Sequence, residues 1–157
     1  FKILKNNINI KKKDKLFFIN KYYKPELPLN LTKYLLKFAN SSIDVSDGLI
    51  DDLSKMINRQ NLSFHLFEKK IPVSKKLSNF IKKKKLNKID LISNGDDYQV
   101  LFTAGINKAR IIQNASKTTG IKITKIGKIV SGKNRSLIFD QKDKQIQAKS
   151  KGYIHRF

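Results

Sequence analysis

Apolar residues recur at helical spacing in four stretches of the chain. In the clearest of them, Leu49, Ile50, Leu53, Met56 and Ile57 stand three or four residues apart and predict one buried helix face. The other three predicted helices place their apolar faces at Leu31, Tyr34, Leu35 and Phe38, at Leu77, Phe80 and Ile81, and at Ala109, Ile112 and Ala115. The expected N-caps, in chain order, are Asn30, Ser46 or Asp47, Ser74 and Asn107, and Gly120 is expected to end the last helix.

Shorter apolar or alternating runs predict strands between these helices. The predicted strands are residues 16–19, 43–46, 62–67, 98–103, 121–130 and 136–139. The last two are expected to pair as a hairpin around a Ser131-Gly132 turn. Pro25 and Pro28 disfavour helix in the residues before them, so residues 22–29 should form an extended linker.

Composition adds a large positive charge to this picture. The 157-residue chain has a formal net charge of +22, which would suit a nucleic-acid-binding protein. However, the basic residues are mostly lysines spread along the chain, and aromatic residues are not interleaved with them for base stacking. Abundant Lys, Asn and Ile is also what an AT-rich coding sequence supplies. We therefore do not expect nucleic acid to be the partner.

Other classes are excluded more simply. The chain has no cysteine, so disulfides and thiolate metal sites are ruled out. Its apolar runs are too short to span a bilayer, and no signal peptide is visible, so no membrane partner and a cytoplasmic location are expected. The chain begins at Phe1, without a methionine and in the middle of a helical pattern, which predicts that it is a piece of a longer protein.

The chemistry of the chain is concentrated in one acidic stretch. Asp44, Asp47, Asp51 and Asp52 fall within nine residues, where a predicted strand turns into a helix. Ligands of open α/β sheets sit beyond strand ends, and Mg²⁺ takes carboxylate and phosphate oxygens together, so the stretch suggests a metal–nucleotide site. Asp and Gly are also ordinary turn residues, and acids favour any helix start, so a purely structural role stays open.

A second acidic pair follows a second turn. Asp96 and Asp97 come directly after Asn94-Gly95 and before a predicted strand, and they strengthen the first site if the fold joins the two. Residues 127–134 (GKIVSGKN) nearly match a phosphate-binding P-loop. We reject that match because Asn134 stands where Ser or Thr is required and no helix is predicted to follow.

Five motifs, in order, resemble thiamine-monophosphate kinase, a member of the aminoimidazole ribonucleotide synthetase-like superfamily. They are residues 43–53 (IDVSDGLIDDL), 71–74 (IPVS), 93–102 (SNGDDYQVLF), 126–129 (IGKI) and the tail Gly152-Tyr153 with His155. The resemblance covers the family's C-terminal domain and implies an α/β (α+β) fold, a mixed sheet with helices packed against it. It assigns residues 29–157 to that domain, and residues 1–28 to the tail of a preceding domain plus a linker.

The same resemblance implies a reaction and a set of site residues. The family transfers phosphate from ATP to thiamine monophosphate with Mg²⁺, yielding thiamine diphosphate, and works as a homodimer. By motif, Asp44 and Asp47 would bind Mg²⁺, Ser46 would contact ATP, and Asp96 and Tyr153 would contact the substrate. Asn94 replaces a family glycine and Asp96 is one methylene shorter than the family's glutamate. Because the family's N-terminal domain supplies further metal ligands, this chain alone is expected to be inactive.

Two other functions stay open from the sequence. One is a related ATP-dependent synthetase of the same superfamily that acts on another substrate. The other is a basic nucleic-acid-binding domain, which the net charge of +22 would suit.

Overall fold

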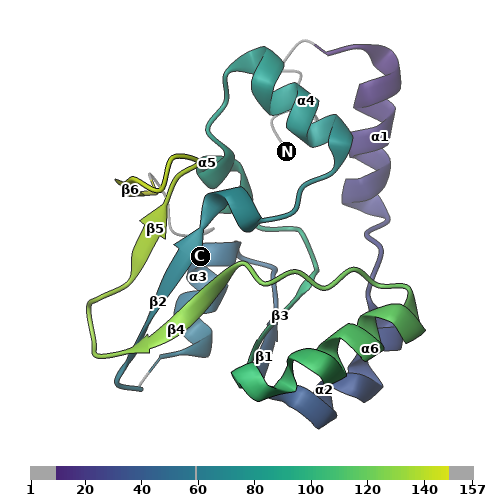
Figure 1. The fold of residues 1–157 in the computed structure, drawn as a ribbon. Coiled ribbons are helices and arrows are strands. Elements are labelled where there is room, and N and C mark those ends of the chain that lie inside the picture. Colours follow the sequence, from purple (N-terminus) through teal and green to yellow (C-terminus); the bar gives the residue numbers. More distant parts are fainter. Residues whose placement is uncertain (1–9, 59, 149–157) are drawn as a thin grey trace, which may run out of the picture.

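The computed structural model describes residues 10–58 and 60–148 and forms a mixed α and β structure (Figure 1). Its helices are α1 (Lys12–Tyr23), α2 (Thr32–Phe38), α3 (Leu49–Met56), α4 (Lys75–Lys84), α5 (Lys88–Ile92) and α6 (Ala109–Thr119). Three 3₁₀ turns are η1 (Leu29–Leu31), η2 (Glu68–Lys70) and η3 (Ile106–Lys108). The strands are β1 (Ala39–Asp44), β2 (Leu62–Phe67), β3 (Val100–Ala104), β4 (Gly127–Ser131), β5 (Leu137–Phe139) and β6 (Gln145–Ile146).

The strands form two separate sheets. β1 and β3 pair antiparallel, with Ile43 opposite Leu101 and Asp44 opposite Val100. The second sheet has the order β4-β2-β5-β6, in which β2 runs antiparallel to β4 and parallel to β5. This mixed pairing, with helices packed around it, confirms the fold class expected from the sequence.

The predicted hairpin is wrong. β4 and β5 do not pair with each other in the described chain, because β2 lies between them and bonds to both. The register pairs His65 with Lys128 on one side and with Leu137 on the other. Residues 121–126, expected to belong to the first hairpin strand, lie outside any strand. Strand partners far apart in sequence leave no trace in a local pattern, so local spacing favours the nearer partner.

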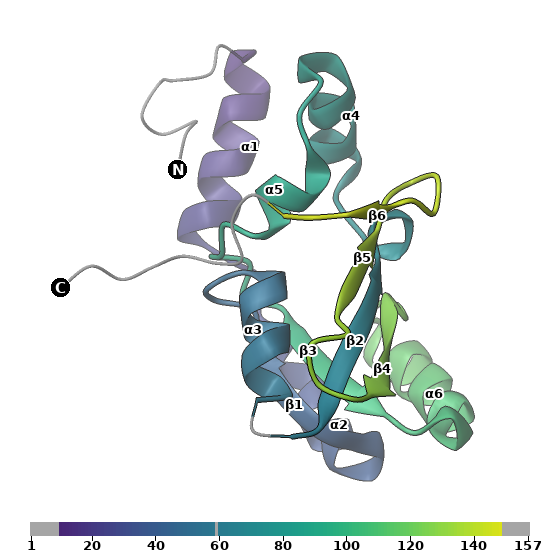
Figure 2. The same cartoon turned by 90° about the vertical axis from the view of Figure 1, so that its left-hand side faces the viewer.

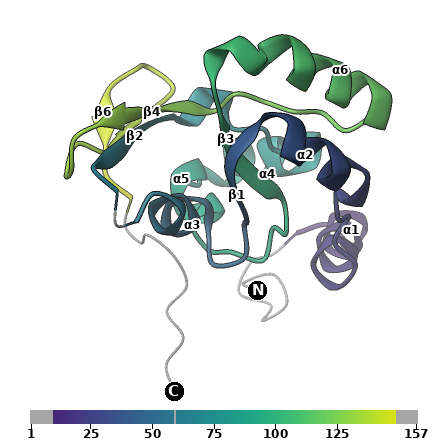
Figure 3. The same ribbon diagram turned by 90° about the horizontal axis from the view of Figure 1, so that it is seen from below.

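Two apolar clusters hold the elements together. The larger one packs the inner face of α3, with Leu49, Ile50 and Leu53, against Phe64 and Leu66 of β2. The smaller joins α2 to α6 through Leu31, Phe38 and Ala115, and these two helices lie side by side in Figure 3. Each fully buried Leu, Ile or Phe side chain contributes about 1.5–3 kcal/mol. The predicted inner faces of α2 and α3 are therefore confirmed.

The helix ends follow the predictions only in part. Ser74 caps α4, since its Oγ accepts a hydrogen bond from the amide of Leu77 at 3.1 Å, and Gly120 ends α6 in the left-handed conformation. Asn30 and Asn107 are not caps. The 3₁₀ turns η1 and η3 contain these residues and run directly into α2 and α6, so the asparagines lie inside helical turns rather than before them.

The N-terminal part of the described chain differs most from its prediction. Residues 16–19 form no strand but the middle of α1, a helix with no buried residue (Figure 2). A short apolar run fits a helix or a strand equally well, and no strand of the two sheets in the described ranges pairs with it. α1 packs beside α4, with the rings of Phe18 and Phe80 5.8 Å apart. The proposed boundary near residue 28 stays a prediction.

No helix in the described ranges combines the length and the apolar character needed to cross a membrane.

Candidate functional site

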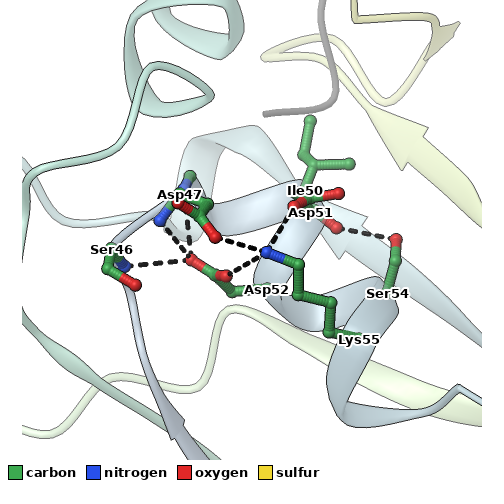
Figure 4. A network of polar contacts seen from close by, with 8 residues as sticks. Ser46, Asp47, Ile50, Asp51, Asp52, Ser54 and Lys55 are labelled. Carbon is green, nitrogen blue, oxygen red and sulfur yellow. Dashed lines mark hydrogen bonds and ion pairs between the residues drawn. The ribbon is translucent and has the colours of Figure 1, made fainter. Parts of the chain in front are cut away.

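The turn between β1 and α3 is organised by a buried carboxylate. Asp52 is 1% exposed, and its Oδ2 accepts hydrogen bonds from the amides of Ser46, Asp47 and Gly48 at 3.0, 3.0 and 3.1 Å (Figure 4). Gly48 is the N-cap of α3, has a φ of 126° and offers no side chain. The predicted cap by Ser46 or Asp47 is therefore wrong: no side chain caps α3, and Asp52 instead ties the preceding turn to the helix.

A group of three carboxylates lies at the start of α3. Asp47, Asp51 and Asp52 each offer an oxygen within 4.8 Å of the others. The ammonium of Lys55 stands among them, 2.5 Å from Asp47 Oδ2, 2.7 Å from Asp51 Oδ2 and 3.4 Å from Asp52 Oδ1. The hydrogen bond to Asp47, followed by that to Asp51, raises the pKa of Lys55 above its ordinary value. We call these three aspartates the acidic cluster.

The second acidic stretch packs directly against the first. The backbone amides of Asp96 and Tyr98 donate to the carbonyls of Ser46 and Val45, both at 2.8 Å. A side chain on Gly48 would place its Cβ 2.5 Å from the carbonyl oxygen of Ser93. On Gly95, the Cβ would stand 2.3 Å from the carbonyl oxygen of Ser46. The glycines of both motifs thus allow the two backbones to touch. The fold therefore joins the two acidic stretches, which is the condition under which the second pair strengthens the first site.

The two aspartates of the second stretch lie on an irregular loop. Asp96 has a φ of 62°, and the loop leads through Tyr98, whose φ is 49°, into β3. Partial burial, and then the neighbouring charge of Asp96, raises the pKa of Asp97 to about 6. Asp97 as a residue is nevertheless exposed to solvent, so water screens the interactions of its charge.

The site residues expected from the sequence fall into three groups. Ser46, Asp47 and Asp96 are brought together by the contact of the two turns. Asp44 is exposed at the end of β1 and is not part of the acidic cluster. Tyr153 lies outside the described residues. None of these positions tests the assigned roles, which stay predictions.

Sequence reasoning missed the parts played by Asp52 and Lys55. The sequence marks Asp52 only as one of four clustered acids, because its three backbone partners depend on the tight turn before it. Lys55 follows Asp51 and Asp52 at spacings of four and three residues, a pattern that predicts ion pairs on a helix. That spacing could have identified Lys55 as a member of the site.

The acidic cluster fits a hard divalent cation. Its potential ligands are carboxylate oxygens, which Mg²⁺ prefers, and two of the three aspartates are partly exposed. The ammonium of Lys55 lies against all three carboxylates and already compensates part of their charge. One ammonium neutralises only part of the charge of three carboxylates.

Comparison with known proteins gives a consistent answer, although no family model matches the chain. A thiamine-monophosphate kinase from Buchnera aphidicola subsp. Acyrthosiphon pisum is 35% identical over 98% of this chain and 47% of that protein. The Escherichia coli K12 thiamine-monophosphate kinase is 27% identical over the same shares, 98% and 47%. The chain thus spans about half the length of these two relatives.

Solved structures agree with this fold. The crystal structure of thiamine monophosphate kinase from Aquifex aeolicus matches with a TM-score of 0.66 and 24% identity, over 92% of this chain and 46% of that one. AaThiL complexed with AMPPCP and TMP matches with a TM-score of 0.71 and 24% identity, over 98% and 46%. These similarities establish the fold, and the Buchnera relative adds sequence identity along nearly the whole chain. The chain therefore belongs to the thiamine-monophosphate kinase family, as a segment about half as long as these relatives.

Proposed function

We propose that this chain is the C-terminal half of an ATP- and Mg²⁺-dependent thiamine-monophosphate kinase. The observation that carries the proposal is the contact between the two acidic motif turns, at Ser46 with Asp96 and at Gly48 with Ser93. It gathers, at the end of the β1–β3 pair where Asp44 lies opposite Val100, the residue types that phosphate and metal binding need. The thiamine-monophosphate kinases related to the chain, and the match to a structure holding AMPPCP and TMP, support the same reaction.

In this reaction the γ-phosphoryl group of ATP passes directly to the phosphate of thiamine monophosphate, giving thiamine diphosphate and ADP. Such transfers depend on positioning and on neutralising charge rather than on covalent help from the protein. Bound Mg²⁺ would supply that neutralisation. Asp44 and Asp47 are proposed to hold it, and Ser46, next to Asp47, to contact ATP. Asp96 and Tyr153 are proposed to contact thiamine monophosphate.

Further parts of the proposal concern the whole protein. Residues 1–28 would join a preceding domain to the domain of residues 29–157, and the complete enzyme would be a cytoplasmic homodimer. Half of a kinase lacks part of its substrate site, so the chain alone should not convert thiamine monophosphate to thiamine diphosphate.

The test uses a chimaera in which this chain replaces the matching half of the Buchnera relative. We expect it to convert thiamine monophosphate to thiamine diphosphate with ATP and Mg²⁺, while the chain alone does not. Asp44→Asn and Asp96→Ala should each reduce kcat/KM at least about a hundredfold if they hold metal or substrate in the transition state. Asp143→Asn, which changes an aspartate paired with Lys69, is the matched control and should be without effect. A folded chimaera without activity would overturn the proposal.

The net charge of +22 favours nucleic-acid binding as a second candidate function. Binding to RNA or DNA that weakens steeply with salt would support it. Absence of such binding at 50 mM salt would exclude it. A synthetase of the same superfamily would be recognised by a chimaera that consumes ATP with a different phosphate-bearing substrate.

A further inference from the structure

The four-stranded sheet carries three aromatic side chains on the face that α3 does not cover. Phe64 and Leu66 of β2 pack into the core with α3, which lies on one side of the sheet in Figure 2. Side chains alternate along a strand, so His65 and Phe67 are on the opposite face. Phe139 of β5 lies beside Phe67 in the parallel register and belongs to the same face. All three aromatic residues are partly exposed.

The three rings form one continuous surface. Phe67 and Phe139 are stacked, with ring centroids 5.4 Å apart and ring planes at 19°. His65 meets Phe139 edge-on, with centroids 5.7 Å apart. We call these three residues the aromatic row. Because β2 and β5 are distant in the sequence, no interleaving of aromatic and basic residues along the chain reveals it.

Lysines border the aromatic row. The ammonium of Lys70 lies over the Phe67 ring, 4.7 Å from its centroid, in a cation–π contact. Lys128 of β4 is directly opposite His65 in the register and is exposed. Positive groups thus stand at both ends of the β2 part of the row.

The elements around the aromatic row also carry an excess of positive charge. Residues 62–70 and 127–146 contain seven lysines or arginines and three acidic residues. Of these acids, Glu68 is buried and Asp143 is paired with Lys69. A partner with a negatively charged backbone is therefore attracted to this face.

We propose that the aromatic row is a binding site for single-stranded RNA. Bases of any identity stack on aromatic side chains, while lysines beside the rings hold the phosphates. A four-stranded sheet whose aromatic residues stack two or three bases is an established way to bind RNA. RNA is the expected partner because its loops and ends present unstacked bases, whereas duplex DNA encloses them.

This inference goes beyond the proposed kinase reaction and uses none of the residues assigned to it. It also gives the second candidate function a defined surface, on which the bases contribute as well as the charge.

The ordinary alternative is a small apolar cluster whose rings only pack against one another. In that case the basic residues would still attract nucleic acid, but a strand without bases would bind as well as a strand with them. Removing a ring would then alter stability and leave binding unchanged. Strands with and without bases therefore separate the two explanations.

The experiment measures, by fluorescence anisotropy, binding of a uridine strand of about ten nucleotides to the 157-residue chain. An abasic strand of the same length carries the same phosphates without bases. Phe139→Leu removes a ring and keeps most of its apolar volume, and Phe139→Tyr keeps the ring. Phe17→Leu is the matched control, because Phe17 on α1 also has a lysine over its ring, Lys76 at 4.5 Å. Circular dichroism of each variant reports whether it is folded.

We expect the uridine strand to bind about tenfold more tightly than the abasic strand, the size of effect that one stacked base produces. Phe139→Leu should weaken uridine binding about tenfold, and Phe139→Tyr and Phe17→Leu should stay within about twofold of the unaltered chain. Because the comparison of the two strands needs no variant, the test stands even where a substitution prevents folding.

Equal, salt-dependent binding of the two strands would overturn the inference and leave the charge-driven second candidate function standing. No binding of either strand would overturn both. Uridine binding that Phe139→Leu and Phe17→Leu weaken equally would also overturn the inference. The kinase proposal is tested separately, by the chimaera.

Discussion

The turn between β1 and α3 and the loop between α5 and β3 lie against each other, yet they hold their carboxylates differently. In the first, three backbone amides and Lys55 surround the acidic cluster. In the second, Asp96 and Asp97 are adjacent and exposed, and no ion pair to either is present within the described residues. The negative charge of the first region is compensated by its own turn and helix, whereas the second region keeps negative charge that is open to a ligand. A single fold thus carries one assembled acidic site and one uncompensated pair.

The largest effect is expected from breaking the first region at its centre. Asp52→Ala would leave three amide groups of the turn without their shared acceptor and should lower the free energy of unfolding by about 4 kcal/mol. Asp51→Ala, on the same helix with a side chain 31% exposed, should cost below about 1 kcal/mol. Urea unfolding of both variants measures the difference. Equal losses would contradict the central role of Asp52.

Separating the two regions should have the next largest effect. Gly95→Ala introduces a Cβ 2.3 Å from the carbonyl oxygen of Ser46, at a φ of 79°. Strain and the displaced turn should lower the free energy of unfolding by about 3 kcal/mol. Gly120→Ala has a similar φ of 70° but nothing within 4 Å, so it should cost only about 1 kcal/mol. If thermal and urea unfolding give the same loss for both, the close approach is not what requires glycine at position 95.

The charge of the second region can be tested by changing the pH. Because the pKa of Asp97 is raised to about 6 in the folded chain, the native state holds its proton more tightly than the unfolded state does between pH 4 and 6. Its contribution to stability is therefore present at low pH and is lost as pH rises through about 6.

Asp97→Asn should remove this loss and stabilise the chain at pH 7 by less than about 1 kcal/mol, because water screens the exposed group. Asp96→Asn should move the pKa of Asp97 downward, since the neighbouring charge contributes to the shift. Urea unfolding of Asp97→Asn at pH 7 measures the first effect, and NMR titration of the Asp97 carboxyl carbon, with and without Asp96→Asn, measures the second. A titration midpoint near 4 in the unaltered chain would refute this account.

The smallest effect concerns the compensation of the first region. Lys55→Gln should lower the free energy of unfolding by only about 0.5 kcal/mol, because half-exposed ion pairs are weak. The loss should shrink in 1 M salt, where exposed charges are screened. Denaturant unfolding at low and high salt, with Lys84→Gln at an exposed position of α4 as control, checks this. A salt-independent loss of several kcal/mol would mean that the pairs of Lys55 do not behave as ordinary exposed ion pairs.

The sequence by itself determined what repeats over short distances. Alternation at residues 62–67 predicted β2 with its observed bounds, and helical spacing predicted the buried faces of α2 and α3. The motifs also singled out Ser46, Asp47 and Asp96, which the fold brings together. These features depend on backbone geometry within a few residues, and a linear pattern records that geometry.

Tertiary structure alone decided the rest. The parallel pairing of β2 with β5 joins residues about seventy positions apart, and residues 16–19 belong to a helix that packs beside α4. Whether Asp52 or Asp47 caps the turn, and which aspartates share Lys55, depends on how closely Gly48 and Gly95 let two backbones approach. A contact between distant segments depends on both segments at once. The local sequence of either segment is therefore not enough to predict it.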